Sequence, residues 1–403
     1  MGDISIMKLK VVTALAGSML ALAACGSSST SSTASSASKA PVRIGVDTSL
    51  TGPLGALGLG EQRGAEMAVS QLNASGGIDG HKVILDVQDD QSNSTQSLLA
   101  YQNLVAKGDV GVVGSIDDNG ILATVGAMNR KKVPYIATAP IQGTTSHYLF
   151  GEVNTGSQYG SRLVPYMKAK GLVNVAVLYD SQYSFAIDAY KGFVTAAKAA
   201  GINIKLVQTD SLTSTDFSAS LSKVSAANVQ ALVVLDIGAG PVILAKQFAA
   251  LGLSSSVKLL MTGAEAAPEF LQPAGTAANG IVMDATPNVI VNQLPASPLK
   301  TALTKLSVPY QQKYGRLPSQ FATSGYTGVE LIAAAIEKGK STSPASITKE
   351  LSNMSILLPG GDYHYSATNV SGLQSNAIFL VRVVNGAYVP TSWQKKQFSS
   401  NMK

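Results

Sequence analysis

The sequence predicts an α/β protein with two lobes, each built on a parallel sheet. From Val42 onward, short apolar runs alternate with amphipathic segments of helical period. This βαβα order is typical of a parallel sheet with helices on both faces. The series restarts near Ser157 and continues over the rest of roughly 360 residues, which is enough chain for two hydrophobic cores.

The first series of elements occupies residues 42–138. Its clearest helix is Glu61–Asn73, in which apolar residues recur at helical spacing before Gly76-Gly77 ends it. The other helices are recognised by the same helical spacing, and the strands by short apolar runs. We expect strands at 42–47, 82–88, 110–114 and 133–138, and further helices at 94–107 and 119–131.

The second series begins with a helix and repeats the alternation. We expect helices at 157–170, 185–200, 216–227 and 241–251, and strands at 174–180, 202–208, 229–236, 258–263 and 280–286. An Asn- and Pro-rich loop at 287–298 leads to helices at 299–314, 320–338 and 344–353. Turn signals at Gly372 and Asn385-Gly386 indicate antiparallel strands at 362–367 and 376–384.

The first forty residues have the layout of a secreted lipoprotein. Lys8 and Lys10 precede a charge-free apolar segment, residues 11–24, which is too short to span a bilayer comfortably. Leu22-Ala23-Ala24 before the only cysteine, Cys25, resembles a bacterial lipobox. We therefore expect a signal peptide at 1–25, lipidation of Cys25, a Ser/Thr-rich tether at 26–40, and anchoring at the extracytoplasmic face of the cell membrane.

The charge pattern argues against a nucleic-acid partner. Thirty Lys and Arg against 24 Asp and Glu give +6, and only 13% of residues are charged. The densest basic run, Arg130-Lys131-Lys132, stands at the end of an expected helix, where cations are favoured by the helix dipole. We interpret it as a solvated helix terminus rather than a binding patch.

No catalytic motif is found in the sequence. There is no G-x-S-x-G, H-E-x-x-H or C-x-x-C pattern, and His81, His147 and His364 are scattered over a turn, a loop and an expected strand. Gly339-Lys340-Ser341 imitates the end of a P-loop, but a helix rather than a strand precedes it. We therefore expect no enzyme activity, no cofactor and no metal.

One segment resembles a known family. Arg43–Asn93 combines a Ser-x-Thr-Gly-Pro loop, the run G-A-E-x-A-V-x-x-x-N-A-x-G-G-I-x-G and the pair Asp89-Asp90. These features, in this order, resemble the opening of type I periplasmic solute-binding proteins of the branched-chain amino-acid (Leu/Ile/Val-binding) family. The similarity continues through 179–186, 245–253 and 262–265.

The resemblance implies a domain organisation that the alternation of elements does not. Alternation alone would give two consecutive domains. The family instead implies two Rossmann-like lobes joined by a hinge of three strands, with lobe one at 42–153 and 287–360 and lobe two at 154–286 and 361–395. In such a fold the ligand binds between the lobes, beyond the carboxyl ends of the strands.

The resemblance also implies a function. The protein would be a monomer that captures a small polar solute, a branched-chain or related amino acid, and delivers it to an ABC permease with its ATPase subunits. Amide, urea-like, nucleoside or aromatic-acid ligands, or a role as a sensory subunit, remain open alternatives.

Candidate ligand-binding residues on lobe one lie in three loops after strands. Leu54 and Leu57 could cover an apolar side chain, and the third loop supplies Thr138, Ala139 and Thr144. The family binds the ligand's α-carboxylate with hydroxyl groups from the second and third loops. Here the second loop places acids, Asp117 and Asp118, at that position.

Two interpretations of this acidic pair remain open. Asp118 or Asn119 could simply cap the following helix. Alternatively, the pocket accepts a hydrogen-bond donor such as an amide, hydroxyl or amine, because a carboxylate in the site would repel another carboxylate.

On lobe two, the resemblance places Glu265 where the family pairs an acid with the ligand's α-ammonium group. Tyr179 and Tyr183 follow the strand after which the family's aromatic residues close over the ligand. Asp236 ends a later strand, but Ile237 stands where the family has an aromatic residue. The lobe-two half of the site is therefore expected to match an amino-acid binder only in part.

Overall fold

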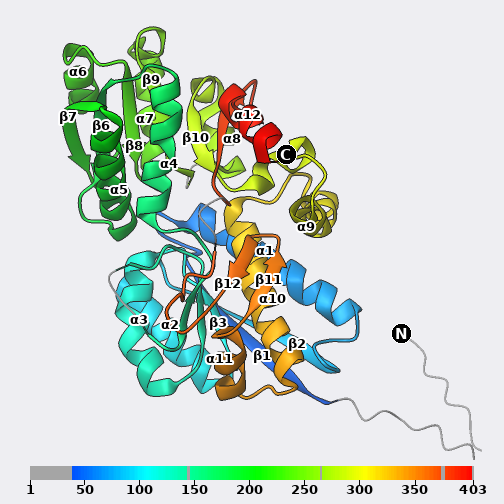
Figure 1. Cartoon of the computed structure of the whole chain (residues 1–403). Helices are drawn as coiled ribbons and strands as arrows, with labels where there is room; N and C mark the ends of the chain where they lie inside the picture. Colours follow the sequence, from blue (N-terminus) through cyan, green and yellow to red (C-terminus); the bar gives the residue numbers. More distant parts are fainter. Residues whose placement is uncertain (1–38, 143–145, 264–265, 374–376, 402–403) are drawn as a thin grey trace, which may run out of the picture. The chain divides into compact units, whose positions relative to one another are not determined.

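The computed structural model describes residues 39–142, 146–263, 266–373 and 377–401 (Figure 1). The predicted signal peptide, Cys25 and nearly all of the predicted tether lie outside these ranges, as do Thr144 and Glu265.

The first sheet has five parallel strands in the order β2-β1-β3-β4-β5. Its strands are β1 (Lys39–Thr48), β2 (His81–Asp89), β3 (Val112–Gly114), β4 (Tyr135–Ala137) and β5 (Leu149–Gly151). Successive side chains of a strand point to opposite faces, so Val112 and Val113 enter two different apolar clusters.

Helices cover both faces of this sheet. They are α1 (Gly55–Ala74), α2 (Ser94–Ala106), α3 (Asp118–Lys131), α10 (Gln320–Gly339) and α11 (Pro344–Leu351). One apolar cluster includes residues of α1, α10 and α11, and the other includes residues of α2 and α3. The helices therefore pack on the sheet as a doubly wound α/β fold requires.

The second sheet has the order β14-β13-β10-β9-β8-β6-β7. Its strands are β6 (Asn174–Asp180), β7 (Asn203–Asp210), β8 (Ala231–Leu235), β9 (Lys258–Met261), β10 (Val282–Ala285), β13 (Phe379–Val384) and β14 (Ala387–Pro390). The pairs among β6 to β10 are parallel, whereas β13 is antiparallel to β10 and β14. The two mainly parallel sheets confirm the predicted α/β class.

The remaining elements of this half are mostly helical. They are α4 (Gly156–Ala169), α5 (Ser184–Ala200), α6 (Ser218–Ala226), α7 (Gly240–Ala250), α8 (Pro268–Ala274) and α12 (Ser392–Asn401), with short 3₁₀ turns at Leu253–Ser255 and Gly275–Ala278. Short α8 was not predicted, because Pro268 and Pro273 and its seven-residue length hide the helical period.

The segment between the last parallel strand and the C-terminal strands differs from expectation. Residues Pro287–Gln293, expected to be a loop, form a 3₁₀ turn, which is followed by α9 (Pro298–Tyr314). The expected strand at 362–367 is β12 (Gly361–His364), and its partner is β11 (Ser355–Leu358), which was not predicted. Four-residue strands carry too little periodicity to be recognised.

The hairpin β11-β12 packs with the first sheet. Tyr363 and Tyr365 belong to the apolar cluster of α1 and α10, and the Tyr363 hydroxyl donates to the Glu152 carbonyl oxygen at 2.9 Å. Residues 361–395 were expected in lobe two, but β12 pairs with β11, and the chain enters the second sheet only at β13. The exact division into lobes stays a prediction.

Helix α1 begins earlier than predicted, at Gly55 instead of Glu61, so Leu57 and Gly58 are helical rather than part of a loop. Its glycines serve close packing. A Cβ on Gly58 would lie 1.7 Å from the Ser49 carbonyl oxygen, and one on Gly64 would lie 1.8 Å from the Ala322 carbonyl oxygen. Those glycines disguised the start of the helix, because glycine is a poor helix former.

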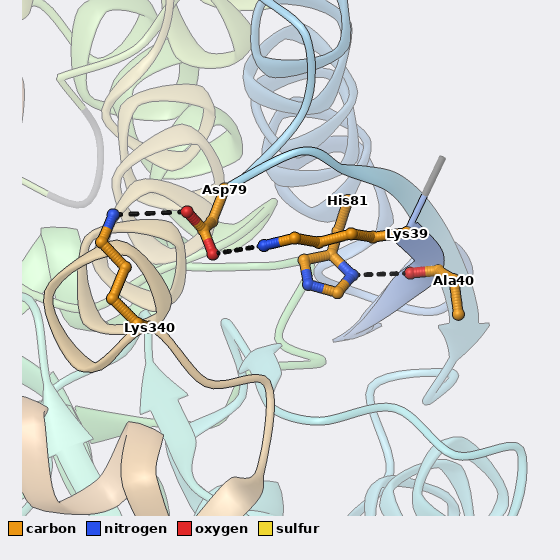
Figure 2. Close-up of polar contacts among 5 residues, drawn as sticks. All are labelled: Lys39, Ala40, Asp79, His81 and Lys340. Carbon is orange, nitrogen blue, oxygen red and sulfur yellow. Dashed lines mark hydrogen bonds and ion pairs between the residues drawn. The ribbon is translucent and has the colours of Figure 1, made fainter. Parts of the chain in front are cut away.

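Ion pairs join the start of β1 to the turn before β2 and to the end of α10 (Figure 2). Asp79 lies between Lys39 and Lys340, with oxygen–nitrogen distances of 2.8 and 3.3 Å. Lys39 and, to a lesser extent, Lys340 lower the pKa of the Asp79 carboxyl. His81 Nδ1 lies 2.7 Å from the Ala40 carbonyl oxygen. These contacts hold the start of β1 against the turn before β2.

Candidate functional site

A cavity lined by residues from both halves of the chain holds about 500 Å³ of empty space, which includes the open solvent at its mouth. Loops after β3 and β4, the residues around α4 and α5, and the start of α10 all contribute. The lining residues are Ile116, Asp118, Thr138, Ala139, Pro140, Val153, Tyr159, Tyr183, Phe185, Ile237, Thr286, Gln320, Phe321 and Ser324. The position agrees with the general rule that ligands bind beyond the carboxyl ends of parallel strands.

The cavity wall is apolar and aromatic, with a few polar groups. Four aromatic rings and five aliphatic or small residues make up most of the lining. Asp118 is the only acid among the described lining residues, and none of those residues is Lys, Arg or His. A wall of this kind suits a small solute with an apolar body and one or two polar groups.

Two adjacent acids at the start of α3 have different roles. Asp117 is the N-cap, and its side chain accepts from the Asn119 backbone N–H at 3.1 Å. Asp118 is the first residue of the helix, is 1% exposed and lines the cavity. The cap is therefore one residue earlier than expected, and Asp118 is left available to the cavity.

The Asp118 carboxylate has few partners. Its Oδ2 accepts from Gln142 Nε2 at 3.3 Å, and its Oδ1 has no hydrogen-bond partner among the described residues. Burial and, to a lesser extent, the charge of Asp117 together raise the pKa of Asp118 to about 7, while the nearby Tyr183 hydroxyl and Phe185 backbone N–H oppose the shift.

Tyr183 connects the two halves at the cavity. Its hydroxyl donates to the Ile116 carbonyl oxygen at 3.3 Å, and the ring lines the cavity. The neighbouring Ser184 hydroxyl donates to Asn119 Oδ1 at 2.6 Å. The start of α5 is thereby bound to the start of α3, which carries Asp118, and to the loop before it.

Thr138 lines the cavity beside a buried acid. Its hydroxyl donates to Glu61 Oε1, whose carboxyl is fully buried. Burial raises the pKa of Glu61 to about 8, while the hydrogen bond from Thr138 and the nearby Thr48 hydroxyl oppose the shift. Ala139 follows Thr138 in the lining, so two of the three residues proposed for this loop reach the cavity.

The structure places the other proposed residues elsewhere. Leu54 is fully buried in an apolar cluster shared with the second half, and Leu57 borders a neighbouring apolar pocket. Tyr179 stacks on Tyr190 with ring centroids 4.2 Å apart. Asp236 is buried and accepts from the Ile237 backbone N–H at 2.7 Å. None of these four residues lines the cavity.

Helix α10 contributes residues to the cavity that were not predicted from the sequence. Gln320, Phe321 and Ser324 line the cavity at the start of this helix, which Ser319 caps by accepting from the Ala322 N–H at 3.2 Å. The helix was predicted with nearly correct bounds. Its place at the cavity follows from tertiary packing against α1, which no local sequence pattern reveals.

Comparison with known proteins gives the family. A family model described as periplasmic binding protein matches residues 41–387. The chain belongs to this family. The resemblance to type I solute-binding proteins of the branched-chain amino-acid family, inferred above from Arg43–Asn93, is thereby confirmed.

Curated relatives and solved structures agree with this assignment. The chain is 31% identical to Leu/Ile/Val-binding protein homolog 3 of Brucella melitensis, over 77% of this chain and 83% of that protein. An extracellular ligand-binding receptor from Rhodopseudomonas palustris has a TM-score of 0.80 at 22% identity, covering 88% of this chain and 99% of the other.

A third similar protein was solved with its ligand. The branched-chain amino acid transporter substrate binding protein LivJ of Streptococcus pneumoniae, in complex with isoleucine, has a TM-score of 0.75 at 24% identity, covering 86% of this chain and 97% of the other. These likenesses establish the type I periplasmic binding protein fold.

No helix in the described ranges is both long and apolar enough to cross a membrane. In the same part of the chain, no group of three or more His, Cys, Asp or Glu side chains is placed to hold a metal ion.

Proposed function

We propose that this protein is an extracytoplasmic lipoprotein that captures a branched-chain or related amino acid for an ABC importer. The observation that carries the proposal is the cavity lined from both halves of the chain, because its ligand would contact the two halves together. A solute that binds only when the halves are together stabilises that arrangement by its differential affinity. A permease could then recognise the liganded form.

The chemistry of the cavity wall supports a small amphiphilic solute. The rings of Phe185 and Phe321 offer apolar surface, while Asp118 and Ser324 offer polar atoms. The family relationship and the structure of the similar substrate binding protein LivJ with isoleucine support an aliphatic amino acid as the ligand.

A thermal-shift screen tests the proposed ligand class. The chain carrying Cys25→Ser would be heated with each amino acid, and with an amide, a nucleoside and an aromatic acid. A ligand at one hundred times its Kd stabilises a protein by about 2.7 kcal/mol, which gives a shift of several degrees. We expect leucine, isoleucine or valine to give the largest shift. A response confined to the amide, nucleoside or aromatic acid would refute the amino-acid proposal.

The lipoprotein part of the proposal rests on the sequence around Cys25. Two or more acyl chains anchor a protein firmly, because each buried methylene contributes about 0.8 kcal/mol. Mass spectrometry of the protein from its native membrane should show a chain that begins at Cys25 and carries a lipid. An unmodified Cys25 in that preparation would refute the anchor and leave the solute-binding proposal untouched.

A further inference from the structure

One carboxylate oxygen in the cavity wall is buried without a partner. Asp118 is 1% exposed, its Oδ1 has no hydrogen-bond partner among the described residues, and the residue lines the cavity. A buried acceptor that lacks a donor is costly, and a buried charge more so. Such a group in a native protein calls for an explanation, and a bound ligand that donates to it is one.

A second acceptor with the same property comes from a different element. Gln320, at the start of α10, lines the same cavity, and its Oε1 is buried with no partner among the described residues. Two acceptors from α3 and α10 therefore border one space. Because none of the described lining residues is Lys, Arg or His, no cationic side chain of the lining competes for them.

The aromatic wall favours the same kind of group. Tyr183, Phe185 and Phe321 line the cavity with Asp118 and Gln320. The face of an aromatic ring carries negative electrostatic potential and attracts cations, while its surface packs against hydrocarbon. The wall therefore accepts an apolar body that ends in a positively charged donor.

We propose that Asp118 and Gln320 bind a protonated amino group of the solute, whose apolar body packs against the aromatic wall. This inference rests on the proposed function, because it assigns one end of the solute captured in that cavity. An ammonium group donates to both oxygens, and its hydrogen bond to Asp118 is charge-assisted. The ligand class is thus an amine with an apolar body, and a carboxylate is not required for recognition.

This assignment differs from the one that the family resemblance implies. The resemblance gives the ammonium-binding role to Glu265 on lobe two, whereas the geometry gives it to Asp118, which begins α3 beside the first sheet. A purely structural role for Asp118 makes a different prediction. An acid in the first turn of a helix stabilises the helix dipole, so its removal would then lower the stability of the ligand-free protein.

Two matched pairs of compounds test the inference on the unmodified binding site. Leucine would be titrated first, followed by 3-methylbutylamine, which lacks the carboxylate, and 4-methylpentanoate, which lacks the amine. Benzylamine and benzoate form the second pair. Isothermal titration calorimetry at pH 8 should show that the amine of at least one pair binds and that its matched acid binds at least about 30-fold more weakly.

Two isosteric variants complete the test. Asp118→Asn should weaken the binding of leucine and of the amines by at least about 30-fold, because it removes the charge that pairs with the ammonium. Asp117→Asn is the matched control, since asparagine is an equally good N-cap, and it should change affinity only a few-fold. The ligand-free melting temperature of Asp118→Asn at pH 8 should equal or exceed that of the parent protein.

The outcomes separate this inference from the proposed function. Acids that bind as well as their matched amines, or an Asp118→Asn variant that binds leucine normally, would overturn the role of Asp118 and leave solute capture standing. A clear fall in the ligand-free melting temperature of Asp118→Asn would overturn it in favour of the structural role. If no compound in this set or in the wider screen bound the parent protein, the proposed function itself would fail.

Discussion

The buried Glu61 carboxyl makes the stability of the folded protein depend on pH. Its carboxyl is fully buried beside Thr138, and burial raises its pKa from 4.5 to about 8. Between these two values the folded protein keeps a proton that the unfolded chain has lost. The contribution of Glu61 is therefore fully present below pH 4.5 and is lost as the pH rises through about 8.

The magnitude follows from linkage. One extra proton on the folded state lowers the free energy of unfolding by about 1.4 kcal/mol for each unit of rising pH. Glu61→Gln keeps the shape of the side chain and an oxygen that can accept from Thr138, but it cannot ionise. The variant should match the parent near pH 5 and be more stable near pH 8, by an amount on the order of 3 kcal/mol.

Urea unfolding followed by circular dichroism at pH 5, 6, 7 and 8 measures the slope of the free energy of unfolding against pH. Glu66→Gln is a matched control on the same helix, because the Glu66 carboxylate is partly exposed and accepts from Gln62 Nε2 at 2.9 Å. It should reproduce the slope of the parent. If Glu61→Gln also reproduced that slope, or if the parent gained stability from pH 5 to pH 8, the reasoning would be refuted.

Three further predictions follow from single contacts. Burial raises the pKa of Asp118 to about 7, so affinity for leucine should rise from pH 6 to pH 8 in calorimetry; a flat profile would contradict pairing with an ammonium group. Gly58→Ala should destabilise the protein by about 1–3 kcal/mol or more in urea, because its Cβ would lie 1.7 Å from a carbonyl oxygen; exposed Gly126→Ala in α3 should be neutral or stabilising, and equal effects would contradict the packing argument. Asp79→Ala should speed hydrogen exchange at the start of β1 with little change in melting temperature, because surface ion pairs contribute little; unchanged exchange would show that the pairs do not hold this segment.

The sequence predicted the elements with a strong period and missed the short ones. Strand β6 was expected at 174–180 and has those bounds, because four apolar residues of it are buried and its neighbours give clear turn signals. Strands such as β5, with three residues, were not predicted. The start of α1 was predicted too late in the sequence, because Gly58 was expected to belong to a flexible loop, whereas it permits close packing inside the helix.

The candidate site could be predicted only where it follows a strand directly. Asp118, Thr138, Ala139 and Tyr183 all follow strand ends and line the cavity. Phe321 could not be found in this way, because it reaches the cavity from a helix far along the chain that packs on α1. The sequence alone does not show that a residue of α10 lies near the residues after the strands.

The central claim, that the cavity lined from both halves binds a small solute, is tested most directly by filling it. Ala139 is 5% exposed in the cavity wall, so Ala139→Phe would place a ring in that space. Calorimetry should show saturable one-to-one binding of leucine to the parent protein and none to a folded Ala139→Phe variant. Equal binding to both proteins would contradict the claim.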